Sequence, residues 1–183
     1  MLIRFYRKNS IITLLLLFLI LFSDCPIQAN DNQNINVRPC LFTNDDLSIY
    51  EIMSSSSIYF AGDYKNVYNA GVAAKYVDGY ILQPNGEFSF NKVVGKRTKE
   101  RGFKLGYDSY GNLVFGGGVC RTSTVLFQAS KKAGFKILER HPHPIPVHYT
   151  PAGTDASVQW GMMDFRFKNN FNNEIIIDRK SVV

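Results

Sequence analysis

The chain is poor in the residues that build metal centres and disulfide frameworks. Its 183 residues include only three cysteines and three histidines, and none of them forms the tight CxxC or HxxxH pairs that are typical of zinc sites. We therefore expect no metal and no cofactor. Internal repeats and low-complexity tracts are also missing. With 45% hydrophobic residues, a chain of this length can bury one sizeable core.

A clustered basic patch is missing as well. The formal net charge is +6, but the lysines and arginines are dispersed along the chain, so the charge does not form a nucleic-acid footprint. We expect no nucleic-acid partner. A modest positive charge is compatible with an anionic cell envelope.

No apolar run is long enough to span a bilayer comfortably. The longest covers residues 11–22, behind a basic flank that includes Arg4 and Arg7, and a small residue, Ala29, offers a cleavage position. This pattern predicts a secretory signal peptide over residues 1–29 and an exported, extracytoplasmic protein. Two alternatives stay open: the segment is retained as a weak membrane anchor, or Cys25 carries a lipid.

The remaining chain divides into a leader and a folded domain. Residues 30–57 are rich in Asn, Asp and Ser, as linkers are, and the domain is expected over residues 58–183. Apolar residues at helical spacing predict a helix from Asp63 to Asp78. Short strand-like runs flank the turn at 84–86, and residues 95–112 read as a long surface loop.

Further strand patterns follow a second helix, which is expected to start at the motif GGGVC and to stop at Gly134. The order is helix, strands, helix, strands. This order predicts a single α+β domain with a mainly antiparallel sheet.

Cys120 lies where three glycines lead into this second helix. Glycine lets a substrate or another backbone approach closely. The helix N-terminus and Arg121 both favour the thiolate form, which is the nucleophile. Two alternatives stay open: an inert buried cysteine, and a redox thiol or disulfide partner of Cys40.

All three histidines lie within eight residues of one another. In an extended segment His141 and His143 project to the same side, so both can address one site as bases, whereas His148 falls on the other face. Asp155 follows closely and can orient an imidazole, as the third group of a Cys-His-polar arrangement does. Surface positions for the histidines, and a turn position for Asp155, are the structural alternatives.

Four sequence blocks occur in an order and spacing that resemble the VanW domain of bacterial cell-envelope proteins: GEFSFNKVVGKRT, GGGVCRTSTVLFQA, AGFKILERHPHPIPVHY and GTDASVQWGMMDFRFKNN. The resemblance runs from about Ile58 to the end of the chain. It implies an exported protein associated with peptidoglycan. It also implies an L,D-transpeptidase activity, in which the motif cysteine takes an acyl group from a stem peptide.

Carried over residue by residue, the resemblance makes Cys120 the nucleophile, His141 and His143 the HPH motif, and Asp155 the acidic residue of the site. Arg97 and Arg121 are expected to pair with carboxylates of the peptidoglycan stem peptides. The other candidates for substrate binding are Gly116, Gly117, Gly118 and Ser123. The competing function is a non-catalytic module that binds peptidoglycan or a partner protein and is linked to glycopeptide (vancomycin) resistance.

Overall fold

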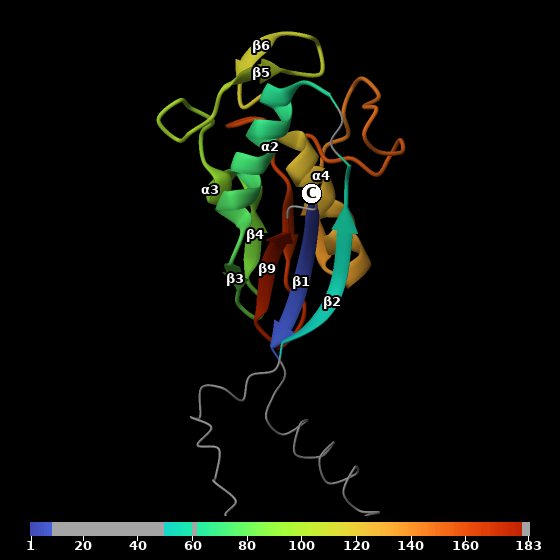
Figure 1. Cartoon of the computed structure of the whole chain (residues 1–183). Coiled ribbons are helices and arrows are strands. Elements are labelled where there is room, and N and C mark those ends of the chain that lie inside the picture. The colour runs from blue at the N-terminus through green and yellow to red at the C-terminus, as the bar shows by residue number, and fades with distance from the viewer. Residues whose placement is uncertain (9–49, 60–61, 181–183) are drawn as a thin grey trace, which may run out of the picture. The chain divides into compact units, whose positions relative to one another are not determined.

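The computed structural model describes residues 1–8, 50–59 and 62–180 (Figure 1). One compact unit consists of Met1–Arg7 and Ile52–Val183, and a second unit, Lys8–Glu51, lies almost wholly outside the described residues. The predicted cleavage position at Ala29, together with Cys25 and Cys40, belongs to that undescribed part.

The described residues form nine strands and three helices. The helices are α2 (Tyr64–Val77), α3 (Phe90–Val94) and α4 (Cys120–Ala133). The strands are β1 (Leu2–Lys8), β2 (Tyr50–Ser57), β3 (Tyr80–Leu82), β4 (Glu87–Ser89), β5 (Leu105–Tyr107), β6 (Leu113–Phe115), β7 (Lys136–Glu139), β8 (Arg166–Lys168) and β9 (Ile175–Lys180).

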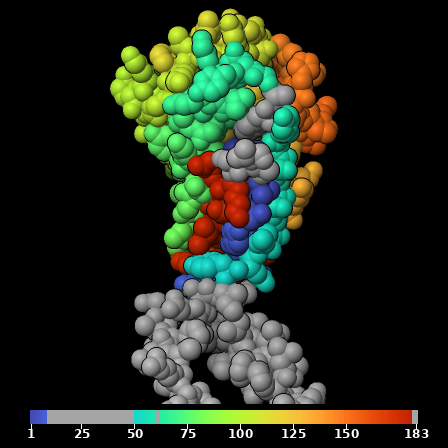
Figure 2. All heavy atoms as spheres, viewed as in Figure 1, coloured from blue at the N-terminus to red at the C-terminus, as the bar shows by residue number. Residues whose placement is uncertain are grey.

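The strands form three sheets, in the orders β2-β1-β9-β3, β4-β8-β7 and β5-β6. The registered strand pairs of the described residues are antiparallel. Figure 2 shows atoms of β9, β1 and β2 side by side on the near face of the molecule. The predicted α+β class with mainly antiparallel sheets is therefore confirmed.

Both predicted long helices are present, and their ends explain why they form. The Asp63 carboxylate caps α2 by accepting hydrogen bonds from the backbone N–H of Lys65, at 2.8 Å, and of Asn66, at 3.3 Å. Helix α4 begins at Cys120 and ends at Gly134, which is left-handed with φ 79°. The GGGVC motif thus marks the start of a helix, as the sequence predicts.

A cluster of phenylalanines joins the two larger sheets. The ring of Phe5 in β1 lies 5.0 Å from that of Phe135 and 5.8 Å from that of Phe167 in β8, in edge-to-face contacts. Phe88 of β4 stacks on Phe167 at 4.8 Å. Phe5, Phe88 and Phe167 are fully buried, so the N-terminal strand shares one core with the strands that lead into the site.

Two strands come from segments that the sequence assigns to a signal peptide and a leader. In β1, Ile3 and Phe5 face the core with no exposed surface, and the strand pairs with β9 along its length, from Leu2 opposite Lys180 to Arg7 opposite Ile175. The basic flank hides this alternation of inward and outward residues. Cleavage of residues 1–29 stays a prediction, and among the described residues no helix is long and apolar enough to cross a membrane.

The loop expected over residues 95–112 contains strand β5, which pairs with β6 from Leu105 opposite Phe115 to Tyr107 opposite Leu113. Its glycines and charges interrupt the alternation that would identify a strand. The two runs around the turn at 84–86 do form strands, but β3 pairs with β9 and β4 pairs with β8. The turn therefore connects two sheets.

Candidate active site

Cys120 is the first residue of α4; it is partly exposed and forms no disulfide with any described residue. The preceding residue, Val119, offers no side-chain cap to the helix, so the positive end of the helix dipole is not satisfied by a capping group. The Cys120 sulfur lies 3.5 Å from the backbone nitrogen of Val158, whose N–H donates to it, and 3.6 Å from the Val158 carbonyl oxygen. The helix N-terminus and the Val158 N–H favour a negatively charged sulfur, whereas the carbonyl oxygen accepts a hydrogen bond from the neutral thiol.

The glycine run allows other backbone segments to approach the start of α4. A Cβ on Gly117 would lie 2.3 Å from the carbonyl carbon of Gly106, and a Cβ on Gly118 would lie 2.4 Å from the carbonyl oxygen of Asn66. Gly118 also has φ +101°. The sequence allows these glycines to admit either a substrate or another backbone segment, and the structure shows close packing of backbone.

Two asparagines of α2 hold this arrangement together. The Asn69 amide donates to the carbonyl oxygens of Lys104 and Gly117, both at 2.9 Å, and its oxygen accepts from the Lys104 N–H at 2.8 Å. Asn66 forms an equivalent pair with the backbone of Tyr107, at 3.0 and 2.8 Å. Helix α2 therefore fixes β5 and the loop that carries Cys120, a role that sequence reasoning missed.

His143 and Asp155 meet beside the thiol. His143 Nδ1 lies 2.7 Å from Asp155 Oδ2, and the same oxygen accepts from the His143 backbone N–H at 2.6 Å. Both side chains are nearly buried, with 5% and 7% of their surfaces exposed. Because Nδ1 is bound to Asp155, Nε2 is the nitrogen left for the hydrogen bond between His143 and Cys120.

These contacts shift the three ionisation equilibria toward an ion pair. Burial works to raise the pKa of Cys120, but the hydrogen bond and charge of His143 and the N–H of Val158 outweigh it, so this pKa lies below its ordinary value. Burial works to lower the pKa of His143, yet its bonds to Cys120 and Asp155 raise that pKa overall. For Asp155, hydrogen bonds from His143 overcome burial and lower the pKa. The site favours thiolate, imidazolium and carboxylate.

His141 does not join this group. Its Nε2 lies 3.0 Å from Glu139 Oε1, and its backbone forms a bridge with Ser157, whose N–H donates to the His141 carbonyl at 2.7 Å. Beyond the bridge at His141 the chain forms no strand, and bends follow at residues 144–145, so the alternation of a regular extended run does not apply to the two histidines. Of the two histidines expected at the site, the structure brings only His143 to the thiol.

Arg140, which sequence reasoning missed, holds Asp155 from the side opposite His143. Its Nη2 lies 2.9 Å from Asp155 Oδ1, its Nε donates to the Asp155 carbonyl at 2.7 Å, and its guanidinium lies 5.2 Å from the centre of the Phe127 ring. Asp155 thus receives Arg140 on one carboxylate oxygen and His143 on the other. Fifteen residues separate Arg140 from Asp155, and no local pattern marks such a pair.

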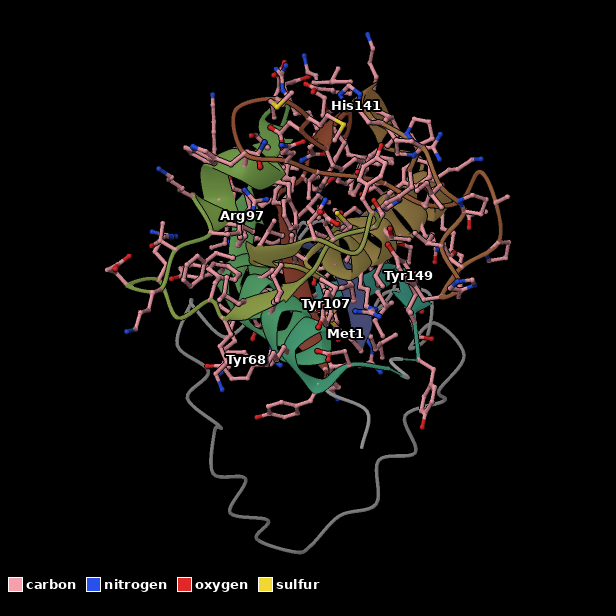
Figure 3. All side chains as sticks on the ribbon, turned by 90° about the horizontal axis from the view of Figure 1, so that it is seen from above. Met1, Tyr68, Arg97, Tyr107, His141 and Tyr149 are labelled. Atoms are coloured by element: carbon pink, nitrogen blue, oxygen red, sulfur yellow. The ribbon has the colours of Figure 1, made fainter. Side chains whose placement is uncertain are left out.

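Arg97 lies against the glycine run that precedes Cys120, at Gly116. Its Nη1 donates to Asn91 Oδ1 at 2.7 Å and to the Gly95 carbonyl at 2.9 Å, while its buried Nη2 has no hydrogen-bond partner among the described residues. Burial lowers the pKa of Arg97 to about 10, against the opposing charge of Cys120. Figure 3 shows the molecule from above, with Arg97 labelled at the left of the view and Tyr149 at the right.

The other predicted substrate-binding residues, Arg121, Ser123 and Gly116, each contact a different part of the fold. The Arg121 guanidinium lies 5.2 Å from the centre of the Tyr149 ring. Ser123 is fully buried and donates to the Ala156 carbonyl at 2.6 Å, so it ties α4 to the segment that carries Asp155. The side chain of Arg97 fills the space in which a Cβ on Gly116 would lie.

In the described part of the chain no three His, Cys, Asp or Glu side chains gather as metal ligands do.

The chain is similar in sequence to known proteins. The family model described as VanW like protein matches residues 65–182. The chain is 43% identical over 119 residues to an uncharacterized protein, YoaR, of Bacillus subtilis, a match that covers 62% of the chain and 38% of the relative. It is 26% identical over 140 residues to the vancomycin B-type resistance protein VanW of Enterococcus faecalis, covering 72% of the chain and 50% of that protein. The matches therefore span half or less of these curated relatives. No solved structure matches.

Proposed function

Because the chain belongs to the VanW family and its fold sets Cys120 beside His143 and Asp155, we propose that it is a cysteine acyltransferase. In this proposal it is an exported protein of L,D-transpeptidase type that acts on peptidoglycan stem peptides in the cell envelope. The observation that carries the proposal is the series from thiol to imidazole to buried carboxylate. The name of the Enterococcus relative supports a connection with vancomycin resistance.

The first half-reaction follows from the ion pair. The Cys120 thiolate attacks the acyl carbon of the stem peptide, and a C–S bond forms as the carbonyl electron pair moves to oxygen. When the carbonyl re-forms, the C–N bond breaks and the leaving amine takes the Nε2 proton of His143. A thioester on Cys120 and a neutral imidazole remain, with Asp155 holding the ring in place.

The second half-reaction reverses these proton movements. An amine of a neighbouring stem peptide attacks the thioester, and His143 Nε2 accepts the proton that the amine loses. The C–S bond breaks, an amide forms, and the Cys120 thiolate returns. Water in place of the amine gives hydrolysis, so the same residues serve a carboxypeptidase.

Arg97 supports the choice of a substrate that carries a carboxylate. Its Nη2 is a buried donor without a hydrogen-bond partner among the described residues, on a side chain whose pKa responds to the Cys120 charge. A carboxylate bound there would satisfy this donor with a charge-assisted hydrogen bond. A free carboxyl terminus on the leaving amino acid would bring its amide to the thiolate.

Incubation with tetrapeptide muropeptides tests this proposal. The wild-type protein should release the terminal D-amino acid and form cross-linked dimers, and Cys120→Ala should lose roughly 10⁴-fold or more of this activity, as nucleophile variants of other acyl-transfer enzymes do. His148→Ala, at an exposed histidine outside the site, is the control and should keep full activity. Activity that survives Cys120→Ala would end the proposal.

A second candidate, a non-catalytic binding module, is favoured by the exposed apolar side chains of the β5-β6 hairpin. These are Leu105, Tyr107, Tyr110, Leu113, Val114 and Phe115. Exposed apolar groups of this kind often mark binding surfaces. In a cell-wall pull-down, binding that is equal for the wild type and Cys120→Ser, without any acyl adduct, would favour this function over catalysis.

A further inference from the structure

Tyr149 lies between two residues of the site. Its ring meets that of His143 edge to face, with 6.3 Å between the centroids, and the Arg121 guanidinium lies 5.2 Å from the ring centre. These contacts fix the ring against the imidazole that pairs with Cys120. Tyr149 lies in the HPH block of the sequence, yet no pattern there distinguishes it from an ordinary packing residue.

The Tyr149 hydroxyl is buried and makes no hydrogen bond with any described residue. The Thr124 hydroxyl accepts the backbone N–H of Ala156 at 3.0 Å, and toward Tyr149 it acts as a donor, so it does not use the Tyr149 O–H proton. A buried hydroxyl without a partner is unusual, because it has lost its water and gained nothing in return. A bound substrate could supply the hydrogen-bond acceptor that this hydroxyl lacks in the substrate-free protein.

Burial and the charge of Cys120 keep this hydroxyl protonated. Burial first, and the Cys120 thiolate second, raise the pKa of Tyr149 well above its ordinary value. The group therefore stays an O–H donor at all working pH values. The edge-to-face contact of its ring with His143, which is hydrogen-bonded to Cys120, places the donor beside the thiol and imidazole that act on an acyl group.

We propose that the Tyr149 hydroxyl donates a hydrogen bond to the oxyanion that forms when Cys120 attacks an acyl group. This inference rests on the proposed function. As the C–S bond forms, the carbonyl electron pair moves to oxygen, and the Tyr149 O–H, which keeps its proton, binds the negative oxygen. The hydrogen bond missing from the resting site is then made in the transition state, where it lowers the barrier.

Two small probes separate this role from others. Acylation by p-nitrophenyl acetate passes through an oxyanion, whereas alkylation by iodoacetamide is a displacement at carbon that forms none. Tyr149→Phe should slow acylation roughly 10²-fold, the loss expected for one oxyanion donor. The same variant should keep the wild-type alkylation rate and its pH midpoint. Tyr64→Phe, at a tyrosine with 70% of its surface exposed, should change neither reaction.

The two reaction rates distinguish the oxyanion role of Tyr149 from a structural role and from failure of the proposed function. Acylation of Tyr149→Phe at the wild-type rate overturns the oxyanion role while leaving Cys120 as the nucleophile. An equal loss in both reactions, or a lower unfolding temperature, shows a structural role and also overturns it, since removing an unpartnered hydroxyl should not destabilise the fold. If the wild type reacts with neither probe, or Cys120→Ser reacts as fast, the proposed function itself fails.

Discussion

At the scale of single residues, Asp155 links the two charged side chains that organise the site. One of its carboxylate oxygens accepts from His143 and the other from Arg140, at 2.7 and 2.9 Å. A carboxylate shared in this way cannot turn, so it fixes both the tautomer and the direction of the imidazole. The thiolate on Cys120 therefore depends on a chain of contacts that begins at Arg140.

The pH dependence of thiol reactivity follows from these contacts. Removing His143 leaves the burial that raises the pKa of Cys120 and takes away the main group that lowers it. His143→Ala should therefore move the pH midpoint of iodoacetamide alkylation upward, to above that of an ordinary cysteine, and slow alkylation at pH 7. His148→Ala should leave the midpoint unchanged. A midpoint unaffected by His143→Ala would show that the imidazole does not stabilise the thiolate.

Acyl transfer should have a bell-shaped pH profile for the same reason. Activity rises with pH through the lowered pKa of Cys120, as the thiolate forms, and falls through the raised pKa of His143, as the proton for the leaving amine is lost. The plateau should lie between these two values. A profile that only rises with pH would contradict the role of His143 as an acid.

At the scale of elements, the start of α4 is held in place by close packing of the glycine loop against β5 and α2. Local chemistry identifies much of this from sequence: Asp63 caps α2, Gly134 ends α4, and three glycines precede Cys120. The contacts that complete the site are not local. Asn66 and Asn69 bind backbone more than thirty residues away, and β5 is hidden by glycines and charges, so no periodic pattern reveals them.

Gly117→Ala tests this packing. Its new Cβ would lie 2.3 Å from the Gly106 backbone, and neither segment can move without breaking the Asn69 hydrogen bonds. We expect a loss of about 1–3 kcal/mol in the free energy of unfolding, as for other overpacked sites, together with slower alkylation of Cys120.

The matched control is Gly71→Ala in α2, where a Cβ meets nothing within 4 Å. This change should leave the stability unchanged or raise it by up to about 1 kcal/mol, because alanine favours helix. Urea denaturation of both variants gives the comparison. Equal stability of the two variants would contradict the close packing of the glycine loop.

At the scale of the whole molecule, β1 makes the first residues of the chain part of the described fold. Its pattern was hidden from sequence reasoning because Arg4 and Arg7 resemble the basic flank of a signal peptide. In the structure, Ile3 and Phe5 are fully buried and alternate with Arg4 and Tyr6, which are partly exposed. A mature protein that lacks residues 1–29 would lack this strand.

Phe5→Ala measures how much the fold depends on β1. Phe5 is fully buried among Phe135 and Phe167, so its loss should lower the free energy of unfolding by about 3–5 kcal/mol. Ile52→Ala in β2, at a side chain with 56% of its surface exposed, should change it by about 0.5 kcal/mol or less. Equal stability of the two variants would show that β1 does not contribute to the folded protein.

The central claim is that Cys120 carries an acyl group during turnover. An intact-mass spectrum of the full-length protein after brief incubation with a tetrapeptide muropeptide tests this directly. The account predicts a mass increase equal to the muropeptide minus its terminal amino acid, located on Cys120 by peptide mapping and missing from Cys120→Ser. No adduct under conditions where the terminal amino acid is released, or the same adduct on Cys120→Ser, would contradict it.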